Sequence, residues 1–435
     1  MKLLKADKDR FTEDLNKMLK IVMLNSLGFF FIGFLIPVIA RTSMGATGIQ
    51  LSLVVAIQVL GRLLGGIITG FITDRIKTRK ILVLIGSCGR GVSYFIIFAA
   101  IISNFILLLG VGTFILGFMA GVFWVPFNTI VAEKSNKNHR SQAYGKRDSF
   151  SARGQIFGAL LGFSLFMFGG FFTNNPIILY GSIPFYGLSN FWAGIRFYNK
   201  IDENLTFNEN LEMELNNLNS TSTNSKFSFS RPVLIGLIFL IAVLFLGSVN
   251  GSIAKPFLNV YLIENIESNV NLVIWAYLPA GILATLLAPI LGTIVDKLPP
   301  FLGITIISLS GALVTWLLIS SVNIWMFSGL LLVDLTIMIS GGLFFQNLLS
   351  RITIDNRGKI LGMGEFIASL GSVIGPILGG IAWDLISPQF PFIISIFVEL
   401  SLIPLYLVVV YYLLPHLAET YEIEEKNQVK KIRKI

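Results

Sequence analysis

The side chains that most often perform chemistry in proteins are scarce in this chain. There is one cysteine, Cys88, and the two histidines, His139 and His416, lie far apart in polar segments. The sequence therefore offers no Cys/His cluster for a metal ion or a nucleophilic pair. It also lacks the G-x-x-x-x-G-K-[ST] loop that binds nucleotide phosphates. We expect neither an enzyme nor a protein that holds a cofactor or metal.

A carboxyl group within an apolar stretch is the next candidate for chemistry. Asp334 stands in the middle of the apolar stretch 323–348, and helical spacing places Met338, Gly341 and Phe345 on its face. A charged side chain inside a bilayer costs about 2.5–3.5 kcal/mol on insertion scales, so its presence indicates a function. Asp334 is a candidate proton-binding group, and a structural ion pair with a buried arginine is the alternative.

Basic residues also occur in the apolar stretches. Arg62 forms a polar stripe with Gln58, Gly65 and Thr69, and it could pair with a carboxylate or bind an anionic group of a substrate. Lys255, beside Pro256, could meet a solute or extend toward lipid headgroups. These two cations are candidates for substrate contact.

The composition shows which elements must position these residues. Hydrophobic residues make up 54% of the chain and charged residues only 13%, so a water-soluble fold is excluded. A membrane-spanning helix needs about 20 apolar residues, and twelve stretches qualify. They lie near 21–40, 50–72, 80–102, 105–131, 150–172, 176–195, 232–262, 270–294, 300–320, 323–348, 360–384 and 389–413.

The distribution of positive charge predicts the orientation in the membrane. Most of the 33 Lys and Arg residues fall in alternate loops and in the two ends of the chain. Because cytoplasmic loops are enriched in Lys and Arg, we expect both termini in the cytoplasm and the protein in the plasma membrane. The net charge of +9 is explained in this way, so we predict no nucleic-acid partner. We also expect a monomer.

The two halves of the chain resemble each other. At a constant shift of 217 positions, Arg140, Asp148 and four other residues up to Gly162 fall on Arg357, Glu365 and their counterparts up to Gly379. This repeat predicts two lobes of six helices. We expect the first lobe at 1–195, a flexible polar linker at 196–231, the second lobe at 232–414 and a basic tail at 415–435.

The loop between the second and third stretches carries a motif. It reads G70-F-I-T-D74-R75-I-K-T-R79-K80, which resembles the loop signature of the major facilitator superfamily, a family of secondary transporters. The resemblance implies a gating loop, formed here by Gly70, Asp74, Arg75, Arg79 and Lys80. Its arginines could pair with Glu133 or Asp148, and simple cytoplasmic charges are the alternative.

A glycine-rich stretch adds to the resemblance. G371-S-V-I-G375-P376-I-L-G379-G380 has small residues four positions apart, which allow helices to pack closely in lipid. In the drug/proton antiporters of the family such a glycine-proline motif sits in the fifth helix. Here that helix has Ala159 in place of the proline, which weakens an assignment as a drug exporter.

The family's cavity is lined by the first and fourth helices of each half, which suggests further site residues. Polar and aromatic candidates on those helices are Asn25, Phe29, Trp124, Asn128, Asn250, Phe345 and Gln346. Asp334 lies on the same set of helices. Arg90 and Glu399 are assigned no substrate role, because the third and sixth helices of each half are usually peripheral in this family. Arg153, one turn inside the fifth helix, is assigned none either, and it could join the cytoplasmic gating contacts.

Together these features predict an all-helical membrane protein of twelve spans that moves a small organic solute by alternating access. Its energy would come from an ion gradient, most simply of protons. The alternatives are a drug/proton exporter and a sensor of the same fold that transports nothing. The excess of buried arginine and lysine slightly favours a neutral or anionic solute.

Overall fold

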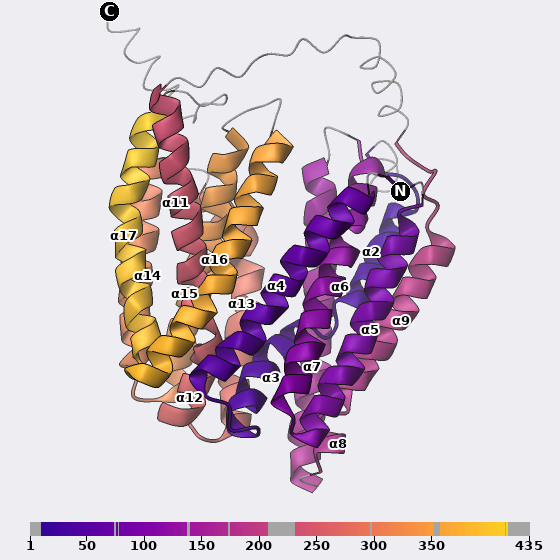
Figure 1. Ribbon diagram of the computed structural model, residues 1–435, viewed down its shortest axis with the longest axis horizontal. Coiled ribbons are helices and arrows are strands. Elements are labelled where there is room, and N and C mark those ends of the chain that lie inside the picture. The colour runs from indigo at the N-terminus through magenta and orange to yellow at the C-terminus, as the bar shows by residue number, and fades with distance from the viewer. Residues whose placement is uncertain are drawn as a thin grey trace, which may run out of the picture. The chain divides into compact units, whose positions relative to one another are not determined.

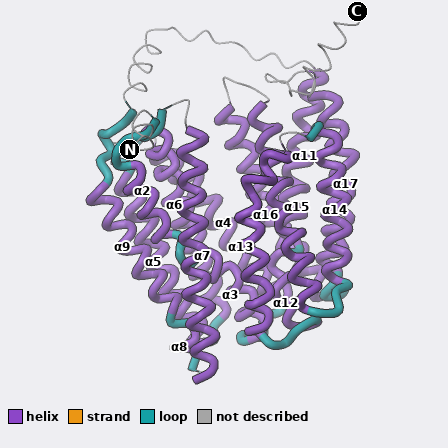
Figure 2. Tube along the Cα trace, turned by 180° about the vertical axis from the view of Figure 1, so that it is seen from behind, coloured by secondary structure: helices purple, strands orange, loops and turns teal. Residues whose placement is uncertain are grey.

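The computed structural model describes residues 10–73, 75–76, 78–136, 140–172, 175–207, 231–295, 298–351, 357–413 and 415. All regular elements in these residues are helices (Figures 1 and 2). Asp74, both histidines, most of the expected linker and nearly all of the expected tail lie outside the described residues. The chain divides into a first unit, Met1–Ala46 with Ile57–Lys226, and a second unit, Thr47–Ala56 with Phe227–Ile435.

The helices of the first part of the chain run from indigo to magenta in Figure 1. They are α2 (Leu15–Asn25), α3 (Phe29–Thr42), α4 (Gly48–Thr73), α5 (Lys80–Ser103), α6 (Ile106–Glu133), α7 (Arg140–Phe172), α8 (Pro176–Leu179) and α9 (Ser182–Lys200). Residues 47–56, at the start of α4, group with the second unit. All the other helices in this set belong to the first unit.

The second unit contains the remaining helices. They are α11 (Arg231–Ile253), α12 (Lys255–Asn265), α13 (Val270–Val295), α14 (Pro300–Ile319), α15 (Ile324–Arg351), α16 (Arg357–Leu385) and α17 (Phe390–Leu413). Within the described residues, ten helical segments are long and apolar enough to cross a membrane. With α9 and α13, they occupy the twelve expected positions.

Helices suit this composition because lipid offers no hydrogen-bond partners. A helix satisfies its backbone N–H and C=O groups internally, and its apolar side chains can then face the bilayer. Many large apolar side chains are accordingly exposed, including Phe168, Phe172 and Tyr411. The expected all-helical membrane fold is confirmed.

The first span of each half is interrupted, although we expected one continuous helix in each place. The sequence Ser26–Gly28 separates α2 from α3, and Ala254 separates α11 from α12. Pro256 follows the second break, and proline fits the first turn of a new helix because it has no N–H to donate. At the first break, a Cβ on Gly28 would lie 2.6 Å from the hydroxyl of Tyr94, so glycine makes room for that side chain.

The fifth span also differs from expectation. Helix α7 begins at Arg140 rather than near residue 150, because the hydropathy of a stretch shows where a helix can enter lipid and not where it starts. The residues before 150 are mostly polar and extend the helix beyond its apolar part.

Glycines bring equivalent helices into backbone contact in both units. On α7, a Cβ at Gly154 would lie 2.1 Å from the carbonyl oxygen of Met23, and one at Gly158 would lie 1.8 Å from that of Leu27. On α16, which also contains Pro376, a Cβ at Gly371 would lie 2.5 Å from the carbonyl oxygen of Phe245. Any larger residue would force these backbones apart.

Three further glycines of α16 lie close to their neighbours, two of them against α11 and Gly380 against α4. A Cβ at Gly375 would lie 2.1 Å from Ser252 Oγ, one at Gly379 would lie 2.2 Å from the carbonyl oxygen of Ile253, and one at Gly380 would lie 2.3 Å from Ser52 Oγ. The packing of α7 on α2 therefore resembles that of α16 on α11.

Candidate functional site

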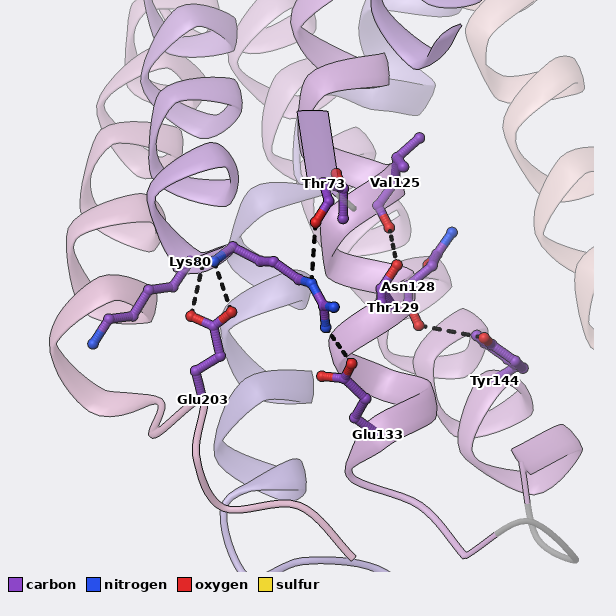
Figure 3. A network of polar contacts seen from close by, with 9 residues as sticks. Thr73, Lys80, Val125, Asn128, Thr129, Glu133, Tyr144 and Glu203 are labelled. Atoms are coloured by element: carbon purple, nitrogen blue, oxygen red, sulfur yellow. Dashed lines mark hydrogen bonds and ion pairs between the residues drawn. The ribbon is translucent and has the colours of Figure 1, made fainter. Parts of the chain in front are cut away.

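The loop between α4 and α5 is held by a network of polar contacts (Figure 3). The guanidinium of Arg79 forms an ion pair with Glu133 at the end of α6, and its Nε donates to the carbonyl oxygen of Thr73 at 3.3 Å. Both side chains of the ion pair are partly exposed, so the pair alone contributes little to stability. It does tie the expected gating loop to α6.

Glu203 is a partner in this network that the sequence did not suggest. Its carboxylate accepts hydrogen bonds from the backbone N–H of Arg79 at 2.7 Å and of Lys80 at 3.3 Å (Figure 3). These are N–H groups at the start of α5, where the helix has unpaired donors and a positive dipole end. Glu203 follows the C-terminal end of α9, 123 residues after Lys80 at the start of α5, so only the tertiary fold brings the two together.

A buried ion pair holds the same end of the first unit. Lys134 Nζ lies 2.7 Å from Asp14 Oδ2, and both side chains are almost fully buried. Lys134 also donates to the carbonyl oxygens of Asp202 and Leu205, at 2.6 and 3.1 Å. Asp202 and Leu205 belong to the stretch expected as a linker, and they supply the acceptors that Lys134 needs when it is removed from water.

The expected partner Asp148 is placed differently. Its carboxylate pairs with the adjacent Arg147 at 2.7 Å and is 66% exposed, rather than meeting Arg75 or Arg79. Arg147 also donates to Asn128 Oδ1 at 2.5 Å, and its guanidinium lies 5.8 Å from the ring centre of Trp124. The exposed side chain of Asp148 reaches its sequence neighbour more easily than a distant loop.

Two cavity candidates of the fourth span therefore have partners inside the first unit. Asn128 binds Arg147, and its carbonyl oxygen also accepts from the hydroxyl of Tyr144 at 3.3 Å (Figure 3). Trp124 packs edge-on against Phe123 and Phe127. In this conformation both side chains make contacts that stabilise the unit.

A polar centre lies halfway along the spans of the first unit. Arg90 on α5 has no exposed surface and donates from both terminal nitrogens to Asn25, which also donates to Ser87 Oγ at 2.6 Å. The guanidinium lies 4.2 Å from the ring centre of Phe29 and 5.5 Å from that of Phe123. Asn25 and Phe29, both expected at a cavity, thus enclose Arg90, to which the family resemblance assigns no substrate role.

Arg62 on α4 belongs to the same region of the first unit. Its side chain is exposed, while Gln58 one turn earlier is partly buried. Arg62 lies close enough to Arg90 for the two positive charges to repel each other. No carboxylate among the described residues forms an ion pair with either arginine.

The polar centre of the second unit is acidic. Asn250 on α11 donates to the carboxyl group of Glu399 on α17, and it accepts from the hydroxyl of Ser395 at 2.7 Å. Asp334 on α15 lies within electrostatic range of Glu399. Both carboxyl groups are partly buried, and no described lysine or arginine forms an ion pair with them.

Glu399 belongs to this centre, although its place on a helix that is usually peripheral in the family favours a structural or lipid-facing role. The signal that could have identified it is the pair Ser395 and Glu399, one helical turn apart in an apolar stretch. Its partner Asn250 comes from a helix that is distant in the sequence.

The remaining candidates are not gathered into either centre. Lys255 is exposed at the start of α12, whereas Phe345 packs against Phe344 and Tyr406 in the core of the second unit. The side chain of Gln346 lies outside the described residues. Arg75 is exposed, and a Cβ on Gly70 would meet no atom within 4 Å.

The fold and its two polar centres define a class of protein: a polytopic membrane protein of two repeated helical units, each with charged groups halfway through the bilayer. The sequence pattern of the Major Facilitator Superfamily matches residues 19–353. The chain belongs to the Major Facilitator Superfamily and is a membrane transporter, which confirms the resemblance seen in the sequence. None of the curated protein sequences compared with the chain matches it.

Solved structures show the same fold at low identity. A bacterial homologue of the human lysosomal transporter Spinster, in an inward-facing and occupied conformation, is 14% identical with a TM-score of 0.70, over 93% of this chain and 97% of that one. The nucleoside transporter NupG is 12% identical with a TM-score of 0.67, over 92% and 100%. A D-xylose-proton symporter is 14% identical with a TM-score of 0.65, over 93% and 98%.

Proposed function

We propose that this transporter moves a small organic solute by alternating access, coupled to protons that bind at Asp334 and Glu399. The observation that carries the proposal is the placement of two carboxyl groups within electrostatic range of each other, near the middle of α15 and α17. Both helices meet α14 at Gly311, where a Cβ would lie 3.6 Å from the carboxyl carbon of Glu399 and 3.6 Å from Ile337 on α15. Neither carboxyl group forms an ion pair with a described basic residue. A structural neighbour that is a D-xylose-proton symporter supports this form of coupling.

Two carboxyl groups in this setting favour a shared proton. Charged groups are disfavoured in a medium of low polarity, and a second negative charge nearby disfavours ionisation further. Asn250 donates to Glu399, so one carboxyl oxygen is already held in place. A change in water access as the transporter changes conformation would alter the charge that the pair can carry, as proton coupling requires.

The network around Arg79 supports a conformational role for the α4–α5 loop. Its contacts with Glu133, Thr73 and Glu203 fix the loop at one end of the first unit, away from the middle of the spans. We place this end and both termini in the cytoplasm, with the protein in the plasma membrane, on the basis of the positive charge in the loops. The loop then controls the rate of conformational exchange rather than solute affinity.

The test uses purified full-length protein in liposomes loaded with the pH-sensitive dye pyranine. A panel of sugars, nucleosides, peptides and organic acids is added outside, and a solute that moves with or against protons changes the dye signal. We expect Asp334→Asn and Glu399→Gln to abolish solute accumulation against a gradient. Exchange of labelled solute at equal pH should persist, since exchange requires no net proton movement.

Glu267→Gln is the matched control, because Glu267 lies in the loop after α12 and accepts a hydrogen bond only from the nearby backbone N–H of Asn269 among the contacts described. It should transport as the wild type does. If Asp334→Asn and Glu399→Gln both transported solute with unchanged proton dependence, these residues would not be the coupling site. Export of hydrophobic compounds alone would support a drug antiporter, and absence of any solute movement would support a sensor.

A further inference from the structure

The first unit contains two arginines that lack a counter-charge among the described residues. Arg90 is fully buried and Arg62 is exposed. Their helices pack on the same stretch of α6, since a Cβ on Gly121 would lie 2.6 Å from the carbonyl oxygen of Arg62, and one on Gly86 would lie 2.6 Å from the backbone nitrogen of Phe123. The two positive charges are therefore near enough to repel each other. Both lie near the middle of helices that span the membrane. Retaining two such charges in a low-polarity interior is costly unless an anion joins them.

The contacts that Arg90 makes do not supply this charge. Its terminal nitrogens donate to the side chain and backbone of Asn25, and the rings of Phe29 and Phe123 lie against the guanidinium. These partners are all neutral. They orient the side chain and compensate part of its lost hydration, but leave its net charge in place.

Two polar atoms beside this centre form no hydrogen bond of normal geometry. Arg90 Nε and the hydroxyl of Tyr94 are both buried and without a hydrogen-bond partner in the described structure. Tyr94 lies near enough to Arg90 for their side chains to interact. Arginine Nε can only donate, and a tyrosine hydroxyl can donate as well. An oxygen atom that accepts from both would satisfy this site.

We propose that Arg62 and Arg90 form a binding subsite for an anionic group of the transported solute, which makes the substrate an organic oxyanion. Arg62 is the exposed residue that meets the anion, and Arg90 is the buried cation behind it. The inference rests on the proposed transport of a small organic solute. It does not depend on the carboxyl pair in the second unit.

Entry to Arg90 requires a side chain to move, since Arg90 has no exposed surface. Of the two rings that cover it, Phe123 is 2% exposed, whereas Phe29 is only partly buried. Phe29 also follows directly after the break between α2 and α3. Its ring is therefore the one that turns to admit the anion.

The experiment compares charged probes with neutral ones of similar size on purified full-length protein. Acetate, succinate and inorganic phosphate are tested against acetamide and succinamide by thermal shift and by isothermal titration calorimetry. We expect at least one anion, and neither amide, to stabilise the wild type. Arg62→Gln should weaken that anion's affinity roughly tenfold or more, because a charge-assisted hydrogen bond is lost, and Arg62→Lys should restore part of it.

Arg196→Gln is the control, since the guanidinium of Arg196 lies over the ring of Trp192 at the end of α9, 4.2 Å from its centre. It should bind the anion with wild-type affinity. Equal stabilisation by anions and amides, no effect of any anion, or an anion effect that survives Arg62→Gln would each overturn the subsite.

Tyr94→Phe tests the second part of the site without removing the arginine. The variant keeps the ring and loses only the hydroxyl, so it should fold and bind the anion several-fold more weakly. Unchanged affinity for the anion would show that the anion does not accept a hydrogen bond from the Tyr94 hydroxyl, which would overturn this part of the subsite. Anion binding without proton-coupled transport would refute the proposed coupling and leave the anion subsite intact. Proton-coupled transport of neutral solutes alone would refute the anion subsite and leave the coupling intact.

Discussion

The two units have similar helix packing and opposite chemistry at their centres. In the first, Gly158 on α7 lies against Leu27, just after the end of α2, and the spans enclose Arg90 with Asn25 and aromatic rings. In the second, Gly375 on α16 lies against α11, and the spans enclose Glu399 with Asn250 and Ser395. A repeated scaffold can thus carry different polar groups on the same set of helices.

The difference shows which features the fold requires and which the function requires. Close helix contacts through small residues are needed in both units, since helix association in lipid depends on packing. Charges halfway through the membrane are not needed for packing and are costly to retain. The first unit has a basic centre and the second an acidic one. This difference fits two separate tasks, namely the proposed anion binding in the first unit and the proposed proton binding in the second.

The largest expected effect comes from removing the buried arginine. Arg90→Met leaves the carbonyl groups of Asn25 without their donors, so we expect a loss of about 3 kcal/mol or more of stability. Glu399→Gln keeps a group of the same shape that can still accept from Asn250, and should cost less than about 1 kcal/mol. Thermal unfolding of the purified variants in detergent measures both. Equal losses would show that the two centres have the same structural role.

A smaller effect is expected at the equivalent glycines. Gly158→Ala would place a Cβ 1.8 Å from the carbonyl oxygen of Leu27, whereas the nearest atom at Gly375 is the hydroxyl of Ser252 at 2.1 Å. At Gly375 the nearest backbone atom, the carbonyl oxygen of Val249, lies farther away at 2.8 Å. Because a backbone atom cannot turn away, Gly158→Ala should cost about 2–3 kcal/mol and Gly375→Ala about 1–2 kcal/mol.

Gly110→Ala is the control for this pair, because a Cβ there would meet nothing within 4 Å. It should unfold at the wild-type temperature. If Gly375→Ala proved the more damaging change, the tighter helix contact would lie in the second unit, contrary to the comparison.

The smallest expected effects concern two carboxylates that cap helix starts, one in each unit. Asp384 accepts from the backbone N–H of Gly48 at 2.7 Å and of Ile49 at 2.8 Å, while one of the two bonds to Glu203 is longer, at 3.3 Å. We expect Asp384→Ala to cost about 1–2 kcal/mol and Glu203→Ala about 1 kcal/mol. Asp148→Ala, at an exposed ion pair, should change melting by less than either. Thermal unfolding of the three variants measures these losses. If Glu203→Ala lost more stability than Asp384→Ala, the predicted order of the two caps would be wrong.

The sequence by itself determined the membrane class, the repeat and the family. Each residue's preference for lipid or water is its own property, so stretches of about 20 apolar residues indicate spans without knowledge of their neighbours. The glycines at a shift of 217 positions likewise revealed the repeat, because close helix packing needs small residues whatever the partner. Asp334 stands out for the same reason, and its role in coupling stays a prediction.

Only the tertiary structure decided which polar groups meet. Asn250 and Glu399 are separated by most of the second unit, and Glu203 reaches the start of α5 from beyond α9. Such pairs depend on which helices are neighbours and how each is rotated about its axis, and neither is encoded in local hydropathy. Arg90 illustrates this, because a peripheral helix suggested a minor role, whereas packing encloses its guanidinium with Asn25 and Phe29.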